Sequence, residues 1–330
     1  MTRWSIYHGD IPQFLLDFAS TDAMVRLKNI GMNCGVEYTN FPVYRDSPPY
    51  SRFDHSLGVA LIVWHFTQDI KQAVAGLFHD ISTPVFAHVV DFLNGDHLQQ
   101  ESTEERTMEI ISRSDQIRGL LTRYGLSVED VCDYHRYPIA DNDSPLLSAD
   151  RLEYSLANAV NYRFRTRAEV QAYYEDLTIE KNESGEDELA FRSPELACAF
   201  AQAALCNSKV YVTDEDRYSM QFLADMLRVA LDGGVLREED LYSTEPQVIL
   251  KLQSGAPTAA LWQQFRGFSA IHRTDQNPGL PQWMSVPAKK RCVDPLVVGH
   301  GRTTELSQAL RKDMADFLNY SFAYWISATV

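Results

Sequence analysis

Four side chains in this sequence could together hold a divalent metal ion: His55, His79, Asp80 and Asp150. Imidazole nitrogens and carboxylate oxygens form a ligand set that suits Mn²⁺, Fe²⁺, Zn²⁺, Ni²⁺, Co²⁺ or Mg²⁺. Because the four residues come from separate segments, coordination positions would stay open for water or substrate. A bound metal lowers the pKa of such a water and polarises a phosphoryl oxygen. The chemistry we expect is hydrolysis of a phosphate ester.

Helix ends must bring these residues together. Apolar residues at positions 57, 61 and 64 have helical spacing, which predicts a helix with His55 near its start. A second helix is predicted over about residues 69–78, ending at His79 and Asp80 shortly before a proline. Asp150 is expected in the first turn of a third helix. The alternative is that these residues only cap helices and make structural hydrogen bonds.

Helical periodicity dominates residues 21–162 and resumes at residue 193, which predicts a mainly α fold. A charged turn between two short apolar runs predicts a β-hairpin over about residues 177–192. We divide the chain into an all-α catalytic domain, residues 1–253, with its metal core at about 50–162, and a small α+β C-terminal lobe, residues 254–330. A final helix is expected in this lobe from residue 303 to about 325.

The composition is that of a soluble globular protein, with 45% hydrophobic and 23% charged residues. The formal net charge of −15 argues against extended binding to nucleic acid, which needs clustered Lys and Arg. The 5 cysteines form no C-x-x-C pair, and we find neither a signal peptide nor a stretch long and apolar enough to span a membrane. We expect a cytoplasmic protein without a membrane partner.

Four stretches lie at or beside the four candidate metal ligands: SRFDHSLGV at 51–59, AGLFHDI at 75–81, PVFAH at 84–88 and ADRLEY at 149–154. Together they resemble the HD superfamily of metal-dependent phosphohydrolases. The closest likeness is to the deoxynucleotide triphosphohydrolase branch, which includes the dGTPases and the SAM-and-HD-domain proteins. The pattern of that branch is approximately S-R-F-E-H-S-L-G-V, then A-L-L-H-D-x-G-H-x-P-F-S-H. A fainter likeness continues from residue 211 to about 252.

The resemblance implies an HD-domain helical bundle and a role for each matching residue. The implied metal ligands are His55, His79, Asp80 and Asp150. The implied catalytic residues are Asp80, His88, Arg52 and Glu104, and the implied substrate contacts are Arg52, Tyr154 and Tyr211. Arg52 would contact phosphate, Tyr211 would line the sugar pocket, and His88 would touch phosphate or protonate a leaving group. The alternatives are purely structural roles: an ion pair of Arg52 with Asp54 or Glu104, and a packed core position for His88.

This sequence departs from the family pattern at residues that matter for chemistry. Thr83 stands where the family has an active-site histidine, and Thr103 stands where a second one precedes the glutamate at position 104. Thr213 and Asp214 replace a His-Lys pair that helps to hold a triphosphate, and an aspartate there would repel one. A monophosphate, a cyclic or modified nucleotide, or another phosphoester is therefore as good a candidate substrate as a triphosphate.

Three functions remain open at this point. The first is a phosphohydrolase of a nucleotide or related metabolite, acting through a metal-activated water. The second is a catalytically degenerate HD protein that binds a nucleotide for regulation. The third is a di-iron oxygenase, since some HD proteins bind two irons. The expected partner is a small phosphate-bearing molecule, and the related enzymes suggest a homo-oligomer of two or more chains.

Overall fold

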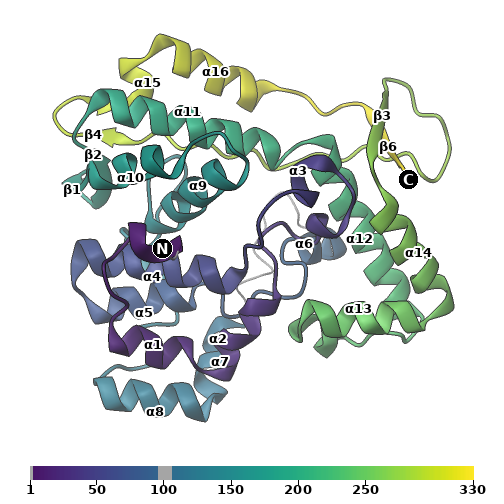
Figure 1. The fold of residues 1–330 in the computed structure, drawn as a ribbon, viewed down its shortest axis with the longest axis horizontal. Coiled ribbons are helices and arrows are strands. Elements are labelled where there is room, and N and C mark those ends of the chain that lie inside the picture. The colour runs from purple at the N-terminus through teal and green to yellow at the C-terminus, as the bar shows by residue number, and fades with distance from the viewer. Residues whose placement is uncertain (1–2, 96–105) are drawn as a thin grey trace.

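The computed structural model describes residues 3–95 and 106–330, so Thr103 and Glu104 lie outside the described residues. The fold is mainly α, as the sequence predicts, with short strands confined to the second half of the chain (Figure 1). Within the described residues, no helix combines the length and the apolar character that crossing a bilayer requires.

Two antiparallel helices form the base on which the candidate site is built. Helix α4 (Arg52–Thr67) begins at Ser51, whose side chain accepts from the Asp54 amide in a capping box. Its residues from Arg52 to Val63 are nearly all buried, so it runs through the core. Helix α5 (Ile70–Phe78) is capped by Asp69 and packs along α4. Both helices match the sequence prediction.

A second layer carries the other side of the site. Helix α9 (Ala149–Asn161), capped by Ser148, crosses α4 and packs on helix α11 (Pro194–Val210). In the chain between α9 and α11, helix α10 (Arg167–Glu175) leads into the predicted hairpin. The two strands of the hairpin, β1 (Leu177–Lys181) and β2 (Asp187–Phe191), are antiparallel. Figure 1 shows α9, α10 and α11 together above α4 and α5.

Shorter elements and a helical extension complete the fold (Figure 1). They are, in chain order, η1 (Arg3–Ile6), α1 (Gln13–Ala19), α2 (Asp22–Arg26), η2 (Leu27–Asn29), η3 (Val36–Tyr38), α3 (Pro42–Arg45), α6 (Val89–Asn94), α7 (Thr107–Arg113), α8 (Asp115–Tyr124), η4 (Tyr134–Arg136), α12 (Asp214–Asp232), η5 (Glu238–Tyr242), α13 (Glu245–Ser254) and α14 (Ala256–Gly267).

The C-terminal residues return to the main body at two places. Strand β4 (Leu296–Val297) pairs in parallel with β2 and antiparallel with β5 (Gly301–Arg302), so the hairpin grows into a sheet of order β1-β2-β4-β5. Strands β3 (Ala270–Thr274) and β6 (Trp325–Thr329) form a separate antiparallel pair. Buried side chains from this part, such as Phe265 and Ile326, belong to the main hydrophobic core.

The expected final helix is wrong in its extent. The structure has α15 (Thr303–Leu306), then α16 (Gln308–Asn319), and Trp325 is the first residue of β6. The aromatic residues after Asn319 suit a strand as well as a helix, and pairing with β3 decides between them. Pairing between distant strands thus overrides the helix that the local sequence pattern predicts.

A buried ion pair fastens the C-terminal return to the hairpin. Arg302 donates to both carboxylate oxygens of Glu188, at 2.6 and 2.8 Å, and also to Glu183. Glu188 is fully buried and accepts from the Leu147 amide as well, at 3.0 Å. The ion pair therefore also supports the loop that leads to Asp150.

Replacing Arg302 by alanine should cost about 3–5 kcal/mol of unfolding free energy, because Glu188 would be left as an uncompensated buried charge. Chemical denaturation monitored by circular dichroism would measure the loss. The matched control is Lys312→Ala, which removes an exposed pair with Asp316 and should leave the unfolding free energy nearly unchanged. Equal effects of the two substitutions would contradict the anchoring role of Arg302.

Candidate metal centre

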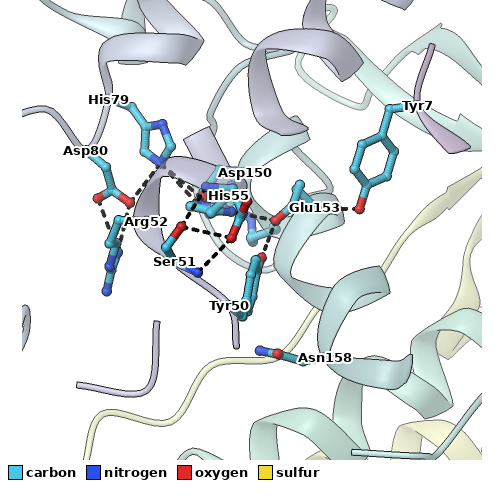
Figure 2. A network of polar contacts seen from close by, with 12 residues as sticks. Tyr7, Tyr50, Ser51, Arg52, His55, His79, Asp80, Asp150, Glu153 and Asn158 are labelled. Atoms are coloured by element: carbon cyan, nitrogen blue, oxygen red, sulfur yellow. Dashed lines mark hydrogen bonds and ion pairs between the residues drawn. The ribbon is translucent and has the colours of Figure 1, made fainter. Parts of the chain in front are cut away.

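The four predicted ligands converge from three elements. His55 lies in the first turn of α4, His79 and Asp80 follow the last turn of α5, and Asp150 lies in the first turn of α9. The Nε2 atoms of His55 and His79 are 3.1 Å apart, and Asp150 Oδ1 lies 2.9 Å from the first and 3.7 Å from the second. Asp80 Oδ2 is 3.5 Å from His79 Nε2. Figure 2 shows these side chains pointing toward one another.

The spacing of the donor atoms suits a single ion. One ligand atom each from His55, His79 and Asp80 lies within 4.8 Å of the others, and all three residues are buried. Two imidazole nitrogens and carboxylate oxygens match the ligand preferences of divalent first-row metals. Asp150 is the most accessible of the four, with 21% of its side chain exposed.

Each histidine is held so that its Nε2 faces the cluster. The Nδ1 atom of His79 donates to the Gly76 carbonyl within the same helix, at 2.7 Å. The Nδ1 atom of His55 lies 2.7 Å from Glu153 Oε2, so donation from Nδ1 leaves the Nε2 lone pair for a metal. A role for Glu153 was not predicted from the sequence. Its position three residues after Asp150, on the same face of α9, was the available signal.

The electrostatic environment favours positive charge at the cluster. Burial would lower the pKa of His55, but hydrogen bonds to Asp150 and Glu153 outweigh it and raise the pKa to about 10. Burial would raise the pKa of Asp80, but the charge of Arg52 and of both histidines holds it well below its usual range. Burial would likewise raise the pKa of Asp150, but the hydrogen bond to His55 and the charge of His55 outweigh it and lower the pKa. A divalent cation fits this arrangement, because it replaces a proton between ionised carboxylates.

Arg52 and Thr83 both donate hydrogen bonds to the candidate ligand Asp80. The Arg52 guanidinium donates to Asp80 at 2.9 and 3.1 Å, and the Thr83 hydroxyl donates to Asp80 Oδ1 at 2.8 Å. Asp54, the expected alternative partner of Arg52, is used in the α4 cap. The Nε atom of Arg52 is buried without a hydrogen-bond partner among the described residues. Thr83 therefore holds the carboxylate of a candidate ligand in place.

His88 belongs to a separate polar pair beside Arg52. Its Nδ1 atom lies 2.8 Å from Asp91 Oδ2, and Asp91 is fully buried. Burial is the main cause that lowers the pKa of His88, the charges of Arg52 and Arg291 act in the same direction, and Asp91 opposes them. The neutral imidazole is thus favoured, with Nδ1 donating to Asp91 and Nε2 left as an acceptor.

An unusual turn sets the position of His88. Phe86 and Ala87 have φ values of 58° and 47°, in the left-handed region that L residues with side chains rarely adopt. Glu245 helps to hold this turn, since its Oε1 accepts from the Phe86 amide at 3.3 Å and from the Gly31 amide at 2.9 Å. Backbone strain of this kind is tolerated where surrounding contacts over-determine the conformation.

The two predicted substrate tyrosines lie on the α9 side of the cluster. The Tyr154 ring centroid is 6.3 Å from that of His55, and the Tyr211 ring is 6.1 Å from Tyr154. Asn158 donates to the Tyr211 hydroxyl at 2.8 Å. Asp214, expected to repel a triphosphate, is instead ion-paired with Arg217 and Arg273 at the start of α12.

Comparisons with known proteins agree with this geometry. The HD domain family matches residues 52–181. The uncharacterized protein YdhJ from Bacillus subtilis is 26% identical over 200 residues, which is 60% of this chain and 60% of YdhJ. The metal-dependent phosphohydrolase cns2 from Cordyceps militaris is 26% identical over 270 residues, covering 77% of this chain and 73% of cns2.

A solved structure supports the fold. A crystal structure of a phosphohydrolase from Bacteroides thetaiotaomicron aligns over 97% of this chain and 96% of that one, with a TM-score of 0.65 and 15% identity. Because the identity is low, this likeness concerns the fold alone. Together with the convergence of two histidines and two aspartates, the family match leads to one conclusion: residues 52–181 form an HD domain, a helical domain that implies a divalent metal ion.

Proposed function

We propose that this protein is a metal-dependent phosphohydrolase that cleaves a phosphate ester of a nucleotide or a related metabolite. The observation that carries the proposal is the convergence of His55, His79, Asp80 and Asp150, with both Nε2 atoms turned inward. These four residues would hold one divalent ion. When bound, such an ion supplies an activated water and a Lewis acid for a phosphoryl oxygen.

The protein's own side chains supply charge and orientation around that ion. Arg52 and Thr83 fix the Asp80 carboxylate through their hydrogen bonds. The buried, unpaired Nε of Arg52 gives this guanidinium a further donor, which suits contact with a phosphate oxygen. The positive charge of Arg291 acts on both His88 and Tyr154, and it would help to attract an anionic substrate.

A nucleotide is the preferred substrate class because aromatic rings adjoin the metal centre. Tyr154 stands beside His55, and Tyr211 stands beside Tyr154 with its hydroxyl fixed by Asn158. Such rings suit the apolar faces of a sugar or base, while the cations suit its phosphate. The ion-paired state of Asp214 removes the repulsion that the sequence suggested, so nucleoside triphosphates stay in the panel of candidate substrates.

Replacing His79 or Asp80 by alanine should remove the metal and lower turnover by about a thousandfold or more, because each supplies a ligand atom. Elemental analysis of purified protein, with a phosphate-release assay on nucleoside mono-, di- and triphosphates and cyclic nucleotides, would measure both effects. His272→Ala changes an exposed histidine on β3 and serves as the matched control.

The same assays separate the other functions. Tight nucleotide binding with no turnover under any of the metals would contradict the proposal and favour a regulatory binding protein. Two irons per chain with the optical bands of a di-iron centre would instead favour an oxygenase. Full activity in His79→Ala would place the reaction elsewhere in the chain.

His88 and Asp91 form the proposed acid–base pair. With Nδ1 donating to Asp91, the Nε2 of neutral His88 can accept a proton during attack on phosphorus and return it to the leaving oxygen. Asp91 would act by fixing the tautomer and the ring orientation. A proton-transfer role of this kind is typically worth about a hundredfold to ten-thousandfold in rate.

The pH profile provides a test of this pair. The activity of the wild-type protein should fall on the acid side with an apparent pKa below 6.5, because protonation of His88 removes the acceptor. Asp91→Asn removes a group that raises the pKa of His88, so the acid limb should move to lower pH while kcat falls about tenfold. His88→Gln should lose the limb together with most of the activity. An unchanged acid limb in both variants would contradict the assignment.

A further inference from the structure

The N-terminal segment reaches the metal centre across the surface of α4. Its first described turn, η1, is followed by Tyr7, which is only 2% exposed. The Tyr7 hydroxyl donates to Glu153 Oε1 at 3.1 Å, spanning 146 residues of sequence. Glu153 in turn contacts His55, so the N-terminal segment is two hydrogen bonds away from a candidate ligand atom (Figure 2).

Glu153 is a closely held carboxylate. It is fully buried, its Oε2 meets His55 Nδ1 at 2.7 Å, and the Tyr50 hydroxyl also donates to Oε2. A Cβ atom on Gly58 would lie 2.6 Å from Glu153 Cγ, so the glycine in α4 is what lets this side chain lie against the helix. Tyr7 is therefore the donor that occupies the oxygen facing away from His55.

Other contacts dock the N-terminal segment on two helices. The indole Nε1 of Trp4 donates to the Asp54 carbonyl in the first turn of α4, at 3.0 Å. From α10, Tyr174 donates to the Tyr7 carbonyl and Arg167 donates to the Ser5 hydroxyl, each at 2.8 Å. Residues 4–7 thus bridge α4 and α10 and deliver one side chain into the gap between α4 and α9.

We propose that Tyr7 is a positioning residue of the metal centre, and that docking of residues 4–7 helps to set the affinity for the divalent ion. The inference rests on the metal centre proposed above. The physical reason is preorganisation: Glu153 orients His55 only while its own carboxylate is fixed, and Tyr7 removes rotational freedom from that carboxylate. Loss of Tyr7 should thereby weaken metal binding without removing any ligand.

The direct test compares dissociation constants for Mn²⁺, Co²⁺ and Zn²⁺, measured by isothermal titration calorimetry on the full chain. Tyr7→Phe should weaken binding about threefold to tenfold, and Glu153→Gln about tenfold to a hundredfold. In the double variant, Tyr7→Phe should add little to Glu153→Gln, because both act through the same carboxylate. Tyr124→Phe is the matched control, because it also removes a hydroxyl that donates to a carboxylate. Tyr124 lies on α8 and donates to Asp17 of α1 at 2.6 Å, and neither residue contacts Glu153 or His55.

A further variant separates docking from the tyrosine hydroxyl itself. Trp4→Phe removes the hydrogen bond to the Asp54 carbonyl and leaves Tyr7 and Glu153 unchanged. Measured at a temperature where every variant is folded by circular dichroism, it should weaken metal binding in the same direction as Tyr7→Phe and by a smaller factor.

The outcomes are distinguishable. A wild-type protein that binds none of the three metals would overturn the metal centre itself. If the wild-type protein binds metal and both Tyr7→Phe and Trp4→Phe have its dissociation constants, the centre stays in place and the role of the N-terminal segment is overturned. A full effect of Tyr7→Phe in the Glu153→Gln background would also overturn it, since Tyr7 would then act by another route.

Discussion

The rest of the site depends on balancing the negative charge of two ionised carboxylates that lie beside two histidines. Asp80 and Asp150 both have a pKa held below the usual range, although burial opposes ionisation. Charge of that sign inside a protein must be balanced, because an unpaired buried carboxylate would take up a proton instead. Arg52 balances part of it, and a divalent cation between the histidines would balance the rest.

Close packing of the surrounding helices brings these charged groups together. Gly76 of α5 faces Val59 and Val63 of α4, and a Cβ atom there would come within 3.3 Å of Val59. Gly58 on the same helix accommodates Glu153 of α9. Glycines at both contacts let three elements approach until their polar ends share one small volume. The caps at Ser51, Asp69 and Ser148 then fix where each helix begins.

Sequence pattern predicts the local part of this structure well. Capping residues, apolar spacing and the turn after β1 correctly placed α4, α5, α9 and the hairpin. It also predicted which side chains converge, since His55, His79, Asp80 and Asp150 stand at helix ends. The end of α16 was missed because Trp325 and its neighbours pair with a strand 51 residues earlier, at Thr274. Nothing in a short window records such a contact.

The partners that Glu153 and Tyr7 contact could not be predicted for the same reason, although the spacing of Glu153 from Asp150 places both on one face of α9. Glu153 contacts His55 across 98 residues, and Tyr7 contacts Glu153 across 146. Thr83 is different, because its hydrogen bond to Asp80 spans only three residues and follows from the turn after α5. Thr83 thus takes a structural role at a candidate ligand.

The most direct test of the central claim is a crystal structure of the protein grown with Mn²⁺ and measured for anomalous scattering. We predict a single anomalous peak per chain, coordinated by the Nε2 atoms of His55 and His79 and by carboxylate oxygens of Asp80 and Asp150. Glu153 should remain hydrogen-bonded to His55 Nδ1 and outside the coordination sphere. No peak among these four side chains, or a peak elsewhere in the chain, would contradict the account.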